Sequence, residues 1–125
     1  WLDRLDDAKV PYAIASSSHR ENITVVLKTI GLQGRFLQMI TSEDVHRGKP
    51  DPEVFLLAAG LLGLSARHCV VFEDALPGIE AGRRAGAAVV AVRTTHPPEI
   101  LTAANRIVTR MDELSIADLA QLVGS

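Results

Sequence analysis

The sequence predicts an α/β fold in which a parallel β-sheet is covered by helices on both faces. Short, nearly all-apolar segments alternate along the chain with longer segments whose apolar residues recur at helical spacing. Strands that are apolar throughout are typical of parallel sheets, because both of their faces are buried. The chain has 125 residues and is 47% hydrophobic, which suits one domain with its own core.

The N-terminal part of the chain is predicted to form a helix, a strand, a second helix and a second strand. Residues 1–9 have the pattern of the end of a helix, which Pro11 terminates. Residues 12–16 and 36–40 are short apolar runs, as expected for buried strands. Between these strands, apolar residues recur at helical spacing from about residue 18 to 30.

The next helix is predicted to begin at Asp51 and Pro52. Aspartate is a favoured N-cap, and proline is a favoured first helical residue. The apolar residues that follow recur at helical spacing and are expected to form the buried face of this helix. They are Val54, Phe55, Ala58, Leu61 and Leu62.

The remaining segments complete the alternation of strands and helices. Strands are expected at residues 70–72 and 88–92, with a short one at 107–108. A helix from Ile79 to Ala85, closed by Gly86, lies between the first two of these strands. The final helix is marked by Ser115 and Asp118, which have the spacing of a capping box.

The composition argues against several classes of function. The formal net charge is −2, the pI about 6.1 and the aromatic content 4%, so the sequence offers neither a basic surface nor stacking residues for a nucleic acid. No apolar stretch is long enough to span a membrane, and the charged N-terminal residues do not resemble a signal peptide. We therefore expect a cytoplasmic protein. The single cysteine, Cys69, is expected to be a buried strand residue.

Polar residues follow three of the predicted strands, at the point where each strand ends. They are Ser16, Ser17 and Ser18 after the first strand, the loop ending in Lys49 after the second, and Glu73 with Asp74 after the third. In open parallel sheets, ligands bind beyond the carboxyl ends of the strands. These residues are therefore expected to meet at one edge of the sheet.

Glu73 and Asp74 are candidate ligands for a cation. Two adjacent carboxylates repel each other unless a cation or a proton lies between them. Mg²⁺ favours oxygen ligands, and it is the cation we expect here. The alternative is that one acid caps the following helix, or forms a turn before Pro77, while the other is solvated.

The serines and Lys49 are candidate ligands for an anion. Hydroxyl and backbone N–H groups at the start of a helix bind anions, although serine also acts there as an ordinary N-cap. Lys49 precedes a proline-capped helix and can hold a phosphate as a compact point charge. Its alternative is an ordinary surface lysine in a polar loop. The three candidate groups, taken in this order, describe a phosphate site with a metal.

Three stretches give the chain a resemblance to the haloacid dehalogenase-like (HAD) phosphohydrolases. They are IASSSHREN (14–22), RGKPDPEVF (47–55) and VVFEDALPGIEAGRRAGA (70–87), which are similar to the second, third and fourth motifs of that family. The order and spacing match the branch of β-phosphoglucomutase and phosphoglycolate phosphatase, and the resemblance covers essentially the whole chain. It implies a Rossmann-like, three-layer α/β/α core.

The resemblance assigns roles to individual residues. Ser16 would donate its hydroxyl to the transferring phosphoryl group, with the Ser17 backbone N–H in support. Lys49 would neutralise charge between the phosphate and the nucleophile, and Glu73 and Asp74 would bind Mg²⁺ directly or through water. His19, Arg20 and Asn22 occupy positions where this branch sometimes contacts its substrate.

The first motif of the family, a strand ending in DxDxT/S, is absent from these residues. Its first aspartate is the nucleophile, and its second is the general acid and base. Asp3, Asp6 and Asp7 follow no apolar strand and are better explained as a solvated helix face. The helical cap domain that selects the substrate is also absent. We therefore expect residues 1–125 to be the C-terminal part of the core domain of a longer enzyme.

Without the first-motif strand the predicted sheet is incomplete. In the family this strand lies between the strands that correspond to residues 12–16 and 70–72. Both neighbours would then expose unpaired backbone edges. A missing N-terminal segment is the expected partner that completes the sheet.

Three functions remain open from the sequence. The parent protein is a Mg²⁺-dependent phosphatase that forms an aspartyl phosphate from a small phosphorylated metabolite, or a β-phosphoglucomutase-type enzyme that returns the phosphoryl group to a sugar. The segment TTHPPEIL (94–101) resembles sugar-phosphate members of the branch. The third alternative is an inactive remnant or binding module. The isolated chain is expected to be inactive because it lacks the nucleophile.

Overall fold

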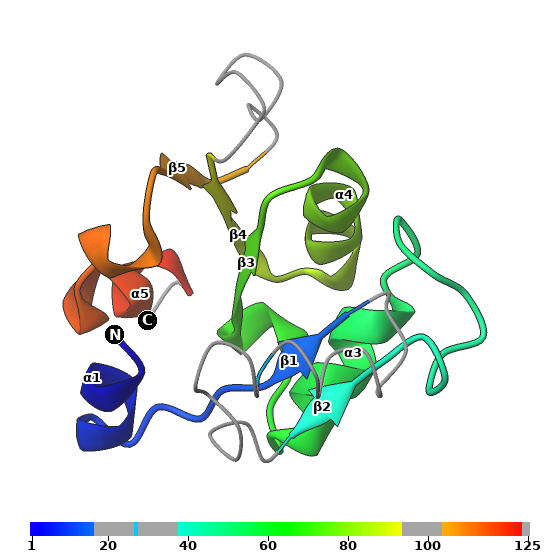
Figure 1. Cartoon of the computed structure of the whole chain (residues 1–125), viewed down its shortest axis with the longest axis horizontal. Coiled ribbons are helices and arrows are strands. Elements are labelled where there is room, and N and C mark those ends of the chain that lie inside the picture. Colours follow the sequence, from blue (N-terminus) through cyan, green and yellow to red (C-terminus); the bar gives the residue numbers. More distant parts are fainter. Residues whose placement is uncertain (17–26, 28–37, 94–103, 124–125) are drawn as a thin grey trace.

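The strands of the chain form two separate parallel groups in a computed structural model that describes residues 1–16, 27, 38–93 and 104–123 (Figure 1). In the first group, β1 (Ile14–Ala15) pairs with β2 (Met39–Ile40). In the second, β4 (Ala88–Val92) lies between β3 (Val70–Glu73) and β5 (Arg106–Val108). The predicted parallel α/β architecture is confirmed, although β1 and β2 are shorter than the apolar runs that predicted them.

The two groups of strands are separated where the sequence predicts the missing strand. Within the described residues, β1 pairs only with β2, and β3 pairs only with β4 and not with β1. The carboxyl ends of β1 and β3 nevertheless face a common point. The Lys49 ammonium lies 3.4 Å from the carbonyl oxygen of Ala15 and 2.8 Å from a carboxylate oxygen of Glu73. The described part of the sheet is thus incomplete between β1 and β3.

Helices cover both faces of the strands. Figure 1 shows α3 (Glu53–Leu61) and α4 (Leu76–Ala85) on one side of β3 and β4, and α1 (Leu2–Asp7) and α5 (Ile116–Leu122) on the other. Two short 3₁₀ helices, η1 (Ala66–His68) and η3 (Met111–Glu113), connect these elements. The three-layer α/β/α arrangement is therefore the one predicted.

The alternation of side chains along β3 divides the core into two clusters. Val71 points toward α4 and belongs to the larger cluster, which also contains Ile79 and Val89. Val70 and Phe72 point to the opposite face and pack against the smaller cluster around Val90, Val108 and Leu114. The Trp1 ring meets the Phe72 ring edge-on, with centroids 5.9 Å apart. Trp1 thus fixes the start of α1 against β3.

The bounds of two helices differ from the prediction. Helix α4 begins at Leu76 rather than Ile79, so the Leu-Pro-Gly segment is its first turn and not a separate loop. Proline is tolerated there because the first N–H groups of a helix have no intrahelical partner. Helix α3 begins one residue late, with Pro52 as its N-cap. The Asp51 carboxylate still accepts the Glu53 backbone N–H, at 3.0 Å.

The buried face of α3 also differs in part from the prediction. Val54, Phe55 and Ala58 are buried as predicted, but Leu61 is 45% exposed and Ala59 is buried in its place. Helix α3 packs against α4, β1 and β2, and its buried stripe includes Ala59 and leaves Leu61 outside it.

The ends of other elements agree with the sequence. Gly86 closes α4 with a φ of 88°, a conformation that glycine adopts without strain. The capping box of α5 is present: the Asp118 N–H donates to the Ser115 hydroxyl at 3.1 Å, and the Ser115 N–H donates to the Asp118 carboxylate at 2.9 Å. These bonds with Ser115 hold the pKa of Asp118 below its usual range.

Three further predictions concern the remaining parts of the chain. Leu27 is helical and buried, but the rest of the helix predicted from residue 18 to 30 lies outside the described residues. Cys69 directly precedes β3 and is only partly buried, and this burial raises the pKa of its thiol. Among the described residues, no helix has the length and apolar character needed to cross a membrane.

Candidate phosphate- and metal-binding site

Three of the residues predicted to form a site meet where β1 and β3 end. Ser16 directly follows β1, and its N–H donates to the Ile40 carbonyl of β2 at 2.9 Å. Glu73 is the last residue of β3. Lys49 comes from the loop between β2 and α3, and its ammonium donates to Glu73 Oε2 at 2.8 Å. The expectation that these polar residues gather at one sheet edge is confirmed for these three.

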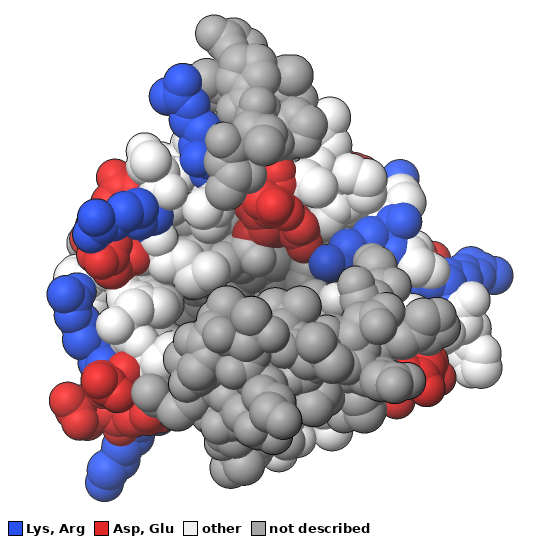
Figure 2. Space-filling model, viewed as in Figure 1, with Lys and Arg blue, Asp and Glu red and all other residues white. Residues whose placement is uncertain are grey.

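The Lys49–Glu73 ion pair is largely withdrawn from water. The exposed fractions of the two side chains are 13% and 12%. The ammonium also lies 5.1 Å from the centroid of the Phe55 ring, within the range of a cation–π interaction. Figure 2 shows basic and acidic side chains meeting near the centre of the displayed face. Lys49 is therefore a partly buried, paired cation, and the alternative of a solvated surface lysine is wrong.

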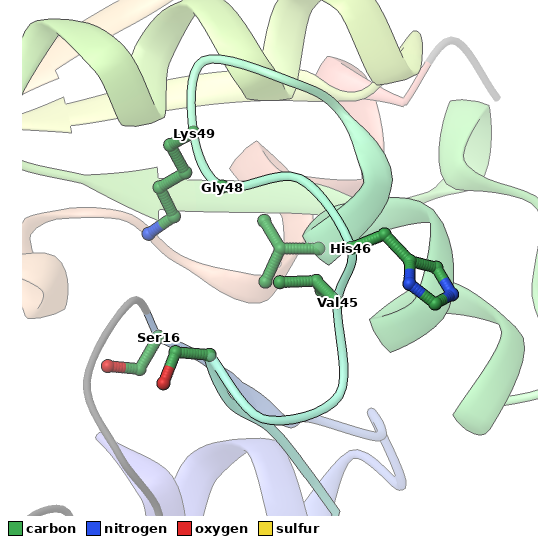
Figure 3. Close-up of a pocket in the computed structure, with 7 residues that line it drawn as sticks. Ser16, Val45, His46, Gly48 and Lys49 are labelled. Atoms are coloured by element: carbon green, nitrogen blue, oxygen red, sulfur yellow. The ribbon is translucent and has the colours of Figure 1, made fainter.

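A small cavity of about 170 Å³ lies beside this ion pair. Figure 3 shows the Ser16 hydroxyl and the Lys49 ammonium on the same side of the loop that carries Lys49, whereas the His46 imidazole points away from both. The cavity is lined by Ser16, Ser42, Val45, His46, Gly48, Lys49 and Val54. A hydroxyl and an ammonium that face a common space suit a small anion.

The loop between β2 and α3 contributes residues that the sequence analysis did not single out. Ser42, Val45 and His46 line the cavity although they belong to no predicted site. The start of this loop is fixed by buried Thr41, whose N–H and hydroxyl both donate to the Asp44 carboxylate, at 2.8 and 3.1 Å. A polar loop after a strand is the only sequence signal for these positions, and it does not distinguish lining residues from solvated ones.

The Glu73 carboxylate lies against the backbone of α4. Its Oε1 accepts the Asp74 N–H at 3.2 Å. A Cβ atom built on Gly78 would lie 2.0 Å from Glu73 Cδ, which is far closer than real atoms approach. Glycine at position 78 therefore leaves the space that the Glu73 carboxylate occupies.

The carboxylates of Glu73 and Asp74 are the described groups suited to Mg²⁺. Among the described residues, no group of three or more His, Cys, Asp or Glu side chains is arranged to hold a metal ion by itself. Mg²⁺ commonly binds through one or two protein carboxylates together with phosphate oxygens and water. Glu73, which is paired with a lysine that lines the cavity, and its exposed neighbour Asp74 could supply the carboxylates of this donor set.

The other residues named from the sequence do not add to the described site. Ser17, His19, Arg20 and Asn22 lie outside the described residues. The aspartates of the N-terminal segment lie on α1, across β3 from α3 and α4 (Figure 1). The Tyr12 hydroxyl donates to Asp6 Oδ1 at 2.9 Å. The helical setting of these aspartates agrees with their interpretation as a helix face.

Comparison with known proteins places this site in a family context. Residues 1–92 match the haloacid dehalogenase-like hydrolase family. The chain is 43% identical over 122 residues to the chloroplastic 5-amino-6-(5-phospho-D-ribitylamino)uracil phosphatase of Arabidopsis thaliana, covering 98% of this chain and 33% of that protein.

Solved structures show the same fold. A HAD family hydrolase from Deinococcus radiodurans with bound phosphate and sodium superposes with a TM-score of 0.83 and 34% identity, over 97% of this chain and 56% of that one. A putative β-phosphoglucomutase from Thermotoga maritima superposes with a TM-score of 0.78 and 30% identity, over 86% of this chain and 51% of that one. The chain thus spans a third of the curated relative and about half of each solved structure. The chain belongs to the haloacid dehalogenase-like hydrolases.

Proposed function

We propose that the chain is the phosphate- and metal-binding part of a Mg²⁺-dependent phosphohydrolase that acts on a small phosphorylated metabolite, most simply a sugar phosphate. The observation that carries this proposal is the meeting of Ser16, Lys49 and Glu73 beside one cavity at the ends of β1 and β3. The phosphatase relative, whose name specifies a phospho-D-ribityl compound, supports the class of substrate.

Each residue of the proposed site has a separate role in binding the phosphoryl group. Ser16 donates its hydroxyl to a phosphoryl oxygen, and Lys49 neutralises the charge that accumulates between the phosphate and the nucleophile. Glu73 and Asp74 would hold Mg²⁺, which would further stabilise negative charge on the phosphoryl oxygens. Ser17, with its backbone N–H, and His19, Arg20 and Asn22 contribute to substrate binding in this proposal.

The nucleophile comes from a segment that precedes these residues in a longer protein, which we call the full-length protein. Residues 1–125 form the C-terminal part of its core domain, and the helical cap also belongs to the preceding segment. The separation of β1 from β3 supports this proposal, because the first-motif strand would fill that position. Its nucleophilic aspartate would then end beside Lys49 and Ser16.

The reaction proceeds in two displacements. An oxygen of the nucleophilic aspartate attacks phosphorus, and the bond from phosphorus to the substrate oxygen breaks as the second aspartate of the first motif gives that oxygen a proton. Water then attacks the aspartyl phosphate and loses its proton to the second aspartate, so that phosphate leaves and both carboxyl groups are restored. The chain without the first motif is inactive in this scheme.

A phosphoglucomutase is the second candidate, supported by the likeness to the putative β-phosphoglucomutase. We expect the full-length protein to release phosphate steadily from one or more members of a sugar-phosphate panel in the presence of Mg²⁺. Chelation with EDTA should abolish this release, because the metal stabilises the transferring phosphoryl group. Conversion between sugar-phosphate isomers without steady release would instead establish the mutase, and no reaction of either kind would refute both.

Replacing Gly78 with alanine in the full-length protein is expected to lower kcat about 100-fold. The new Cβ would displace the Glu73 carboxylate, and with it the contact to Lys49. Gly60→Ala is the matched control, since no atom lies within 4 Å of a Cβ at that position on the exposed side of α3. This control should leave kcat unchanged and stabilise α3 by up to about 1 kcal/mol.

A double substitution tests the cause assigned to the Gly78→Ala effect. Once Glu73→Ala has removed the carboxylate, adding Gly78→Ala should change kcat little further. Steady-state kinetics of the two single variants and the double variant provide the comparison. Additive losses would show that Gly78 acts through something other than Glu73.

A further inference from the structure

We propose that Glu53, in the first turn of α3, is the residue that positions Lys49 for phosphoryl transfer. This inference rests on the proposed function for its catalytic consequence, but its structural consequence can be measured independently. Glu53 follows the site lysine by four residues and contacts neither the cavity nor Glu73 among the described contacts. Its effect on Lys49 passes through the backbone of the loop.

The Glu53 carboxylate holds two consecutive backbone N–H groups of that loop. Its Oε1 accepts from the His46 N–H and, at 3.2 Å, from the Arg47 N–H. Both donors precede Lys49, so one oxygen fixes the backbone on the N-terminal side of the lysine.

The other side of Lys49 is fixed by the start of the same helix. The Asp51 N–H donates to the Gly48 carbonyl at 3.0 Å, and Asp51 Oδ1 accepts the Glu53 N–H at 3.0 Å. The loop is therefore closed onto the first turn of α3 on both sides of the lysine. The ring of Phe55, two residues after Glu53 on α3, has its centroid 5.1 Å from the Lys49 ammonium.

This closure determines where the ammonium can reach. The Lys49 ammonium lies 2.8 Å from Glu73 Oε2 and 3.4 Å from the Ala15 carbonyl oxygen. The backbone of Lys49 nevertheless belongs to a loop in which most residues are exposed. A long lysine side chain has many rotamers, so fixing its backbone removes much of the freedom that would otherwise misplace the charge. Small misplacements of a catalytic group reduce rates strongly.

A different explanation is that Glu53 acts only as a negative charge near the positive end of the α3 dipole. The two explanations make opposite demands on the side chain. Positioning requires an acceptor oxygen at the end of a side chain as long as glutamate. Glu53→Gln keeps both the oxygen and the length, whereas Glu53→Asp shortens the side chain by one methylene. Stabilisation of the helix end requires the charge, which Glu53→Asp keeps and Glu53→Gln removes.

The first readout is the rate at which an amine-acylating reagent modifies Lys49 in the full-length protein, followed by peptide mass mapping. We expect Glu53→Ala and Glu53→Asp to accelerate modification at least about tenfold, because the loop releases the lysine to solvent, and Glu53→Gln to remain near the unmodified protein. The matched control is Glu80→Ala, which removes an exposed carboxylate paired with Arg83 and Arg84 on α4. It should leave Lys49 unchanged.

The second readout is steady-state kinetics with the sugar phosphate that the full-length protein hydrolyses. Glu53→Ala and Glu53→Asp should lower kcat about 10- to 100-fold with KM little changed, and Glu53→Gln should restore most of kcat. Acceleration of Lys49 modification by Glu53→Gln but not by Glu53→Asp would overturn the proposal, as would no acceleration in any variant. If Glu53→Ala and Glu53→Asp accelerate Lys49 modification and Glu53→Gln does not, but the full-length protein hydrolyses no phosphate ester, only the proposed function would be refuted.

Discussion

Replacing Lys49 with methionine in the full-length protein is expected to reduce phosphate release about 1,000-fold and to lower the free energy of unfolding by about 3 kcal/mol. Under the proposed function, the loss of rate follows from removing the cation that would face the transferring phosphoryl group. The loss of stability has a separate origin. The Glu73 side chain is only 12% exposed, and methionine would leave its charge without the opposite charge that now lies beside it.

A double-mutant cycle separates these two effects of Lys49. Glu73→Gln in the Lys49→Met background removes the unpaired charge, so the double variant should recover much of the lost stability while remaining inactive. Chemical denaturation and steady-state kinetics on the same four proteins give both quantities. If Lys49→Met were as stable as the unmodified protein, the ion pair would not be the buried interaction that its geometry indicates.

The isolated chain of 125 residues is expected to unfold on heating without a cooperative transition, or with a melting temperature well below that of the full-length protein. Among the residues that the structure describes, β3 pairs with β4 and β1 with β2, and no strand lies between β1 and β3, so their facing edges are expected to expose N–H and carbonyl groups. The first-motif strand would satisfy both edges and join the two groups of strands into one sheet.

The single tryptophan of the chain is a built-in reporter for this prediction. The Trp1 ring packs edge-on against Phe72 of β3, so its fluorescence follows the integrity of this strand on heating. Backbone hydrogen exchange adds an internal control, because β4 is paired on both sides and should be protected in both proteins. A cooperative melt of the purified monomeric chain, with β1 and β3 fully protected, would contradict the prediction.

The features that could be predicted from the sequence are those set by local pattern and by a general rule of topology. Apolar runs located each strand, and the Ser115–Asp118 spacing located the α5 cap. Because parallel strands present their carboxyl ends at one edge, chain order alone placed Ser16, Lys49 and Glu73 together. This part of the site could be predicted without knowing how residues far apart in the sequence pack together.

The features that could not be predicted depend on packing between elements. The Leu-Pro-Gly segment has the composition of a turn, yet it opens α4, because proline suits a first helical turn and Gly78 admits the Glu73 carboxylate. Leu61 has helical spacing, but the position of β1 and α4 decides which stripe of α3 is buried. The bonds from the His46 and Arg47 N–H groups to Glu53 likewise arise only once the loop has folded onto α3.

The most direct test of the proposed function is phosphate release from sugar phosphates by the full-length protein and by the 125-residue chain, each with Mg²⁺ and with EDTA. The full-length protein should release phosphate steadily with Mg²⁺ only, and Lys49→Met should reduce the release about 1,000-fold. The isolated chain should release none, because the nucleophile of the proposed reaction lies outside it. Steady hydrolysis by the isolated chain, or none by the full-length protein with any substrate, would contradict the assignment.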